Sequence, residues 1–197
     1  MAPTERFDAA YYRRFYRDPR TRVTTPAQVQ RLAAFVAAYL RHLRWPVGSI
    51  LDLGCGLGWW RSAARRCWPK SSYQGVEISD HLCRTHGWTH GSAADFAPGR
   101  RFDLVVCQGV LQYLPDRAAA RALANLGRLC RGALYLEALT TADWRRNCDR
   151  SVTDGAVHLR PAAWYRRRLQ VAFRNCGGGL FVHRQAAVAT YELETLA

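Results

Sequence analysis

The chain contains almost no lysine, because Lys70 is the only lysine among its 29 basic residues. Its longest uninterrupted apolar run, residues 32–40, is far too short to span a membrane. Residues 1–14 lack the apolar stretch that a secretion signal requires. We therefore expect a cytoplasmic protein that does not have a membrane as a partner.

The seven cysteines are odd in number and include no C-x-x-C pair. This pattern indicates neither a disulfide framework nor a zinc ribbon, and it fits a reducing compartment. Metal-capable side chains gather at residues 81–90, but Gly87 interrupts them, and zinc ligands usually pair more regularly. We therefore expect no metal site, and we expect most cysteines to pack as small apolar residues.

The most informative stretch is Leu51-Asp52-Leu53-Gly54-Cys55-Gly56-Leu57-Gly58, which follows an apolar lead-in at residues 47–50. The apolar run predicts a buried parallel strand, and glycines let the backbone turn tightly beside a ligand. Residues 59–68 predict a helix that ends at Pro69. A strand, a glycine loop and a helix start together predict a nucleotide-type site in an open α/β sheet.

Three further segments follow the glycine loop in the order that such a site requires. Residues 72–79 predict a second strand that carries Glu77, 19 residues after Gly58, where an acid hydrogen-bonds a ribose diol. Residues 91–96 predict a turn. Residues 101–114 predict a further strand with Gln108 at its carboxyl end and a loop after it.

The G-x-G-x-G spacing after Asp52 resembles motif I of the class I S-adenosylmethionine-dependent methyltransferases. A nicotinamide enzyme remains an alternative, because it would also use an acid at Glu77, although its glycine spacing is G-x-G-x-x-G. The resemblance implies S-adenosylmethionine as cofactor, S-adenosylhomocysteine (SAH) as product, and a doubly wound Rossmann-like α/β fold. That fold has seven strands, the last of them antiparallel.

The resemblance also implies which residues hold the cofactor. They are Asp52, Gly54, Cys55, Gly56, Gly58, Glu77, Ile78, Ser92, Ala93, Asp95, Phe96 and Gln108, with Tyr12 closing over them. Many members carry Asp where Ser92 stands. Either Asp95 and Phe96 therefore make the adenine contact, or Ser92 makes a weaker one.

The remaining helices and strands are predicted from spacing and from start and stop signals. Helices are expected from Pro26, after the N-cap Thr25, and over 116–130 and 161–175, the last ending at three glycines. Strands are expected at 132–137, 180–184 and 187–193. We expect one globular domain with an N-terminal helical cap region at 1–47 and the methyltransferase domain at 48–197.

Methyl transfer depends mainly on holding two reactants in line, and it needs a base only if the nucleophile starts protonated. Three side chains are candidates for the catalytic site. Glu137 ends the fifth strand, His158 can titrate near neutrality, and Tyr165 either stacks on a flat substrate or packs beneath the cap.

The net charge is +14, and residues 1–48 and 140–184 each carry nine arginines against three acids. GC-rich coding would produce the use of arginine in place of lysine without any function. Arginines such as Arg160 and Arg166–Arg168 would instead bind carboxylate or phosphate. We therefore expect methyl transfer to a small, anionic or aromatic metabolite. The alternatives are an RNA- or protein-directed methyltransferase that uses the arginine-rich flanks, and a cofactor-binding protein without turnover.

Overall fold

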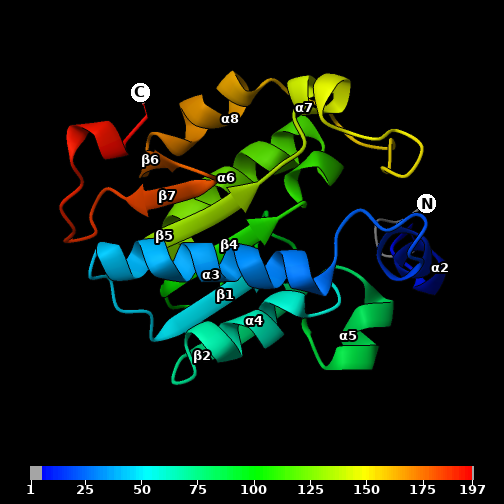
Figure 1. Ribbon diagram of the computed structural model, residues 1–197, viewed down its shortest axis with the longest axis horizontal. Coiled ribbons are helices and arrows are strands. Elements are labelled where there is room, and N and C mark those ends of the chain that lie inside the picture. Colours follow the sequence, from blue (N-terminus) through cyan, green and yellow to red (C-terminus); the bar gives the residue numbers. More distant parts are fainter. Residues whose placement is uncertain (1–5, 197) are drawn as a thin grey trace.

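Seven strands form one sheet in the order β3-β2-β1-β4-β5-β7-β6 in the computed structural model, which describes residues 6–196. The strands are β1 (Ser49–Leu53), β2 (Ser72–Glu77), β3 (Thr89–His90), β4 (Phe102–Gln108), β5 (Cys130–Glu137), β6 (Phe173–Gly177) and β7 (Leu180–His183). Strand β7 is antiparallel to β5 and β6, while the pairs among β1 to β5 are parallel (Figure 1). The predicted doubly wound fold with an antiparallel last strand is confirmed.

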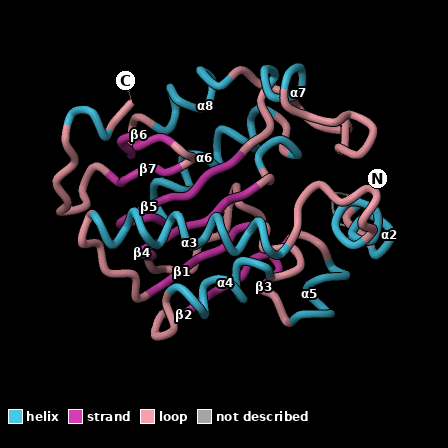
Figure 2. The backbone as a smooth tube through the Cα atoms, viewed as in Figure 1, coloured by secondary structure: helices cyan, strands magenta, loops and turns pink. Residues whose placement is uncertain are grey.

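Helices cover both faces of this sheet (Figure 2). They are α2 (Ala9–Tyr12), the π-helix η1 (Arg13–Arg17), α3 (Pro26–His42), α4 (Trp59–Cys67), α5 (Asp80–His86), the short turn η2 (Leu111–Tyr113), α6 (Asp116–Leu129), α7 (Thr141–Arg146), α8 (Ala162–Leu169) and η3 (Glu192–Glu194). None of the helices described within residues 6–196 has the length and apolar character needed to cross a membrane.

The central strands are buried on both faces because successive side chains alternate between two cores. Leu104 and Val106 of β4 pack with α3 and α4, whereas Val105 and Cys107 pack with α6 and α8. Strand β1 lies between β2 and β4. The chain adds β2 and β3 on one side of β1 and then adds β4 and β5 on its other side, so the strand order reverses at β1. Ligands of such sheets bind at the carboxyl ends of the strands beside this reversal.

Helix α3 begins where the sequence predicts. Thr25 is its N-cap and accepts a hydrogen bond from the Gln28 amide, and Pro26 occupies the first turn. Its apolar face, including Val36 and Leu40, packs against the sheet in the core shared with α4. The helices α2 and η1 lie at the carboxyl ends of the strands, on the same side as the loop that follows α7 (Figure 1). We call residues 6–17 the N-terminal segment.

The predictions for the end of the chain are partly wrong. Helix α8 stops at Leu169, and residues 173–177 form β6 instead of continuing the helix to residue 175. The three glycines at 177–179 form the tight turn between β6 and β7, with φ values of +78°, +57° and +77°. Residues 187–193 contain no strand, so the closing pair is β6 with β7.

Candidate functional site

The loop after β1 depends on glycine for its shape. Gly54, Gly56 and Gly58 have φ values of +73°, +51° and +76°, which side-chain-bearing residues rarely adopt. A Cβ atom on Gly54 would lie 2.3 Å from Cγ2 of Val110, in the loop after β4. Glycine therefore lets these two loops touch. A Cβ on Gly56 would meet only the Gly54 carbonyl, at 4.0 Å, so open space lies beside that residue.

Glu77, at the carboxyl end of β2, is tied to this loop. One carboxylate oxygen accepts a hydrogen bond from the Gly56 amide at 2.8 Å, and the other accepts from the Ile78 and Ser79 amides at 2.8 and 3.0 Å. The residue is only 3% exposed. A carboxylate offers about four acceptor positions, so Glu77 retains one for a ligand hydroxyl.

Asp52 is a buried carboxyl next to the glycine loop. Burial raises the pKa of Asp52 to about 7, the hydroxyl of Tyr73 opposes this by donating a hydrogen bond, and the nearby Glu77 charge adds to it. Asp52 is therefore partly protonated at neutral pH, unlike an exposed aspartate.

We expect the free energy of unfolding to fall between about pH 4 and about pH 7 relative to that of Asp52→Asn. Over that window the folded protein keeps a proton that the unfolded chain has released, so rising pH favours unfolding. Denaturant titrations across this pH range measure the difference, with the exposed Asp95→Asn as control. Parallel pH profiles for wild type and Asp52→Asn would contradict the raised pKa.

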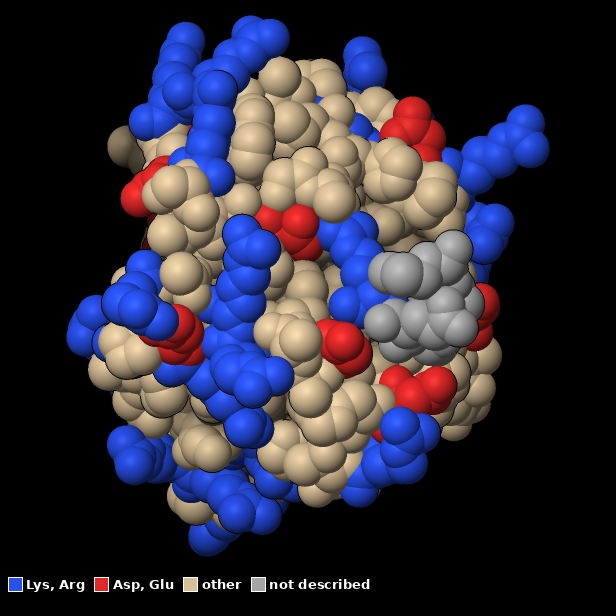
Figure 3. All heavy atoms as spheres, turned by 90° about the vertical axis from the view of Figure 1, so that its right-hand side faces the viewer, with Lys and Arg blue, Asp and Glu red and all other residues tan. Residues whose placement is uncertain are grey.

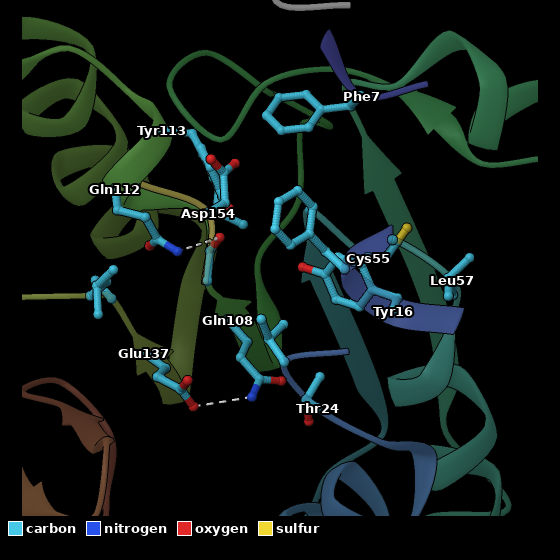
Figure 4. Close-up of a pocket in the computed structure, with 18 of the residues that line it drawn as sticks. Phe7, Tyr16, Thr24, Cys55, Leu57, Gln108, Gln112, Tyr113, Glu137 and Asp154 are labelled. Atoms are coloured by element: carbon cyan, nitrogen blue, oxygen red, sulfur yellow. Dashed lines mark hydrogen bonds between the residues drawn. The ribbon is translucent and has the colours of Figure 1, made fainter. Parts of the chain in front are cut away.

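The glycine loop opens into a cavity of about 900 Å³. Its walls come from the ends of β2, β4 and β5, the polar segment after β5, and the N-terminal segment. In Figure 4 Cys55 and Leu57 of the loop lie across the cavity from Gln112 and Glu137. This is the edge of the sheet where the strand order predicts a ligand.

Most residues predicted to hold a cofactor line this cavity. They are Tyr12, Asp52, Gly54, Cys55, Gly56, Glu77, Ile78, Ser92, Ala93 and Gln108. Gly58, Asp95 and Phe96 do not line it. A Cβ on Gly58 would lie 2.7 Å from the Trp88 ring, so that glycine serves packing. Asp95 is exposed, and Phe96 packs against the core beneath α6.

Glu137 is the one predicted catalytic residue that lines the cavity. Its Oε2 accepts hydrogen bonds from Gln108 Nε2 and from the Tyr135 hydroxyl, both at 3.0 Å. The Oε1 of Gln108 in turn accepts from the Trp60 indole at 2.8 Å. Both ends of the Gln108 amide are thus engaged by protein groups, and this residue orients the carboxylate of Glu137.

The other two predicted catalytic residues lie away from the cavity lining. The His158 side chain is exposed, and its backbone amide donates to the Gln112 carbonyl at 2.7 Å. Tyr165 is buried, and its hydroxyl accepts a hydrogen bond from Arg160 at 3.3 Å. Their catalytic roles stay predictions.

The expected arginine clamp is not formed in the structure. Arg160 is buried and donates to Asp116, to the carbonyls of Leu111 and Leu114, and to the Tyr165 hydroxyl, so it fixes η2 instead of facing a ligand. Arg166–Arg168 lie on α8, outside the lining. Arg22 is the only basic residue of the described lining, against the acids Asp52, Glu77, Glu137, Asp143, Asp149 and Asp154.

The N-terminal segment contributes more to the cavity than the sequence suggested. It adds Phe7, Tyr11, Phe15 and Tyr16 to the predicted Tyr12. The segment is fastened across the cavity at two points. Arg6 pairs with Asp154 at 2.7 Å, and the Tyr11 and Tyr113 hydroxyls share a hydrogen bond of 2.8 Å. A π-helix such as η1 is rare and often occurs at functional sites.

The face that carries the N-terminal segment is of mixed charge. Basic side chains gather along one side and the lower rim, and acidic side chains lie between them nearer the middle (Figure 3). Apart from Arg22, the arginines of the described residues therefore lie outside the cavity lining.

The cysteines show no sign of special chemistry. All seven are free, and burial raises the pKa of the Cys130 thiol to about 12 and that of Cys107 higher still. Within residues 6–196, no three His, Cys, Asp or Glu side chains are grouped so that they could hold a metal ion.

Comparison with known proteins places the chain in a family. The family model described as a methyltransferase domain matches residues 11–185. Over 77 residues the chain is 30% identical to trans-aconitate 2-methyltransferase of Azoarcus sp. (strain BH72), a match that covers 36% of this chain and 30% of that protein.

Solved structures agree with this assignment at the level of the fold. Magnesium protoporphyrin IX methyltransferase from Synechocystis PCC 6803, with bound SAH, aligns with a TM-score of 0.61 and 19% identity over 86% of this chain and 87% of that one. The sugar N-methyltransferase KedS8 from Streptoalloteichus sp. ATCC 53650 aligns with a TM-score of 0.59 and 20% identity over 78% and 86%. The chain belongs to the methyltransferase-domain family, the class I S-adenosylmethionine-dependent methyltransferases.

Proposed function

We propose that this protein transfers a methyl group from S-adenosylmethionine to a small polar molecule bound in the cavity. One observation carries the proposal: the glycine loop and Glu77 open into the same cavity as Glu137. Donor and acceptor sites at the two ends of one cavity allow the in-line approach on which methyl transfer depends. The mainly acidic lining supports an acceptor without negative charge, in place of the anionic one expected from the arginine content.

The residues present fit the cofactor. Glu77 keeps an acceptor position for a ribose hydroxyl, and the open space beside Gly56 lets a ligand approach the loop backbone. Ser92 and Ala93 line the cavity where the family resemblance expects the adenine contact. When bound, the cofactor supplies a methyl group on a sulfonium centre. The carboxylates and aromatic rings of the lining suit that positive charge.

The N-terminal segment crosses the cavity, and this favours a small acceptor. The Arg6–Asp154 ion pair and the Tyr11–Tyr113 hydrogen bond join the N-terminal segment to the opposite wall. A small molecule fits beneath such a roof more readily than a segment of a macromolecule does. The RNA- or protein-directed alternative rests on the arginines around the cavity, and it predicts binding that weakens steeply with added salt.

We expect SAH to bind with micromolar affinity and Glu77→Ala to bind it at least about tenfold more weakly. The substitution removes a charged hydrogen-bond acceptor for the ligand, worth about 1.5–3 kcal/mol, and releases the Gly56 amide. Calorimetric titration with SAH and, in parallel, NADH measures this, with the exposed Glu192→Ala as control. Tight NADH binding without SAH binding would move the protein to the oxidoreductases, and equal SAH affinity in Glu77→Ala would place the cofactor elsewhere.

A further inference from the structure

We propose that the methyl acceptor is an amine and that Glu137 takes up its proton, a step that rests on the methyltransferase function proposed above. Three features of the cavity support this reading: its charge, its aromatic surface and two side-chain oxygens that have no protein donor among the described residues.

The charge of the lining is unbalanced toward acids. Of the six carboxylates, Asp154 is paired with Arg6, and Asp143 is used within the capping box of α7. Asp52 is partly protonated at neutral pH, so it adds less than a full charge. The other three, Glu77, Glu137 and Asp149, face only one basic side chain of the described lining, that of Arg22. A negative cavity attracts cations and repels anions. A protonated amine is therefore drawn into it, whereas a carboxylate or phosphate is repelled.

Aromatic rings cover much of the same cavity. The aromatic members of the lining are Phe7, Tyr11, Tyr12, Phe15, Tyr16, Trp59, Trp60, Tyr113 and Tyr135. The face of an aromatic ring attracts a cation, and enclosures of such rings bind substituted ammonium groups. Acids and rings together thus favour the same class of ligand.

Two lining residues, Gln112 and Glu137, each have a side-chain oxygen without a protein donor among the described residues. Gln112 is only 8% exposed, and its Oε1 has no partner among the described residues. Its amide orientation is fixed because Nε2 donates to the Gly109 carbonyl at 3.0 Å. Glu137 is exposed and uses only Oε2 for Gln108 and Tyr135, so its Oε1 is open to a donor from the cavity. The N–H group of a bound amine can therefore donate to Oε1 of Glu137.

The proton-accepting group also matches an amine better than an alcohol. No histidine contributes to the described lining, so a carboxylate is the base at hand. An alkylammonium has a pKa of about 10.4, whereas that of water, and of a simple alcohol with it, is near 15.7. A carboxylate therefore removes a proton from an alkylammonium far more easily than from an alcohol. The pKa of a phenol is close to that of an alkylammonium, but the phenolate anion is disfavoured in a cavity lined by acids.

The step balances without another reactant. The ammonium gives one proton to the Glu137 carboxylate, and the freed nitrogen lone pair attacks the methyl carbon. The new C–N bond forms as the C–S bond breaks, and that electron pair stays on sulfur as the neutral thioether of SAH. The products are the N-methylated ammonium and SAH, and Glu137 returns its proton to water.

The first test uses matched probes that differ only in the functional group. Benzylamine, benzyl alcohol and benzoate, with the corresponding cyclohexyl set, are titrated into the enzyme–SAH complex and assayed for SAH formation from S-adenosylmethionine. We expect each amine to bind at least about fivefold more tightly than its carboxylate, and methylation to occur on amines alone. The proposal is overturned if no amine binds more tightly than its carboxylate, or if an alcohol or carboxylate is the methylated probe.

The second test is Glu137→Gln, which removes the charge but keeps an oxygen for Gln108 and Tyr135. We expect kcat for the amine that turns over best to fall about 100-fold at neutral pH. The activity should return as the pH approaches the pKa of that amine, because the free base needs no proton acceptor. A pH-independent loss would overturn the role of Glu137. Glu192→Gln is the matched control and should behave as wild type.

SAH affinity separates the two proposals. If wild type fails to bind SAH, the methyltransferase function itself fails. If SAH binds equally to wild type and Glu137→Gln but amines show no preference, only the amine proposal falls.

Discussion

Gly54→Ala should lower the free energy of unfolding by about 2–5 kcal/mol and abolish SAH binding. Two costs add. Alanine in the left-handed region costs about 1–2 kcal/mol, and the new Cβ, 2.3 Å from Cγ2 of Val110, overpacks the contact by about 1–3 kcal/mol. The loops after β1 and β4 must then separate, and both line the cavity. Denaturant unfolding and calorimetric titration with SAH measure the two effects.

Gly99→Ala is the matched control. Gly99 has nearly the same φ, +71°, but a Cβ there would meet nothing within 4 Å. Its substitution should therefore cost only the conformational part, about 1–2 kcal/mol, and leave SAH affinity unchanged. Adding Val110→Ala to Gly54→Ala should recover part of the lost stability. Equal losses for Gly54→Ala and Gly99→Ala would show that the approach of the two loops does not matter.

Arg160→Leu should destabilise the protein by about 3–5 kcal/mol, the range for breaking a buried, hydrogen-bonded charge network. Arg160 is 3% exposed, and its guanidinium donates to the carbonyls of Leu111, the first residue of η2, and Leu114, just after its end. Without it these buried acceptors lose their partner. We also expect amide hydrogen exchange to quicken in residues 111–114, because Arg160 fixes that turn.

Two control variants separate the contributions to this effect. Asp116 pairs with Arg160, but its side chain is 75% exposed, so Asp116→Asn should cost no more than about 1 kcal/mol. Arg166→Leu, on the exposed part of α8, should be close to neutral. A large effect of Asp116→Asn would mean that the ion pair, and not the carbonyl bonds, carries the stability.

The elements that the sequence predicts well are those with local signals. Thr25-Pro26 marks the start of α3, and Pro69 follows the end of α4. The apolar runs of β1 and β4 predict strands that are buried on both faces. The glycine loop is equally predictable from the sequence, because its three positive φ values favour glycine. The family followed from that loop, and most of the residues predicted to hold the cofactor line the cavity.

What the sequence could not show depends on contacts between distant segments. Nothing local stops a helix at Leu169; residues 173–177 become a strand because β7 pairs with them. Arg160 looked like a ligand for an anion, yet it turns inward to the carbonyls of η2, 46 to 49 residues earlier in the chain. The aromatic N-terminal segment likewise gains its role only by lying over Tyr113.

The position of the cavity across the reversal of strand order has a thermodynamic consequence. Its walls join β1 and β2 on one side to β4 and β5 on the other. A molecule bound there is lost when either half unfolds, so its binding free energy adds to the stability of the whole sheet by mass action. At 100 times its Kd a ligand contributes about 2.7 kcal/mol. Occupancy of this cavity should therefore raise the melting temperature, even for a compound that is never methylated.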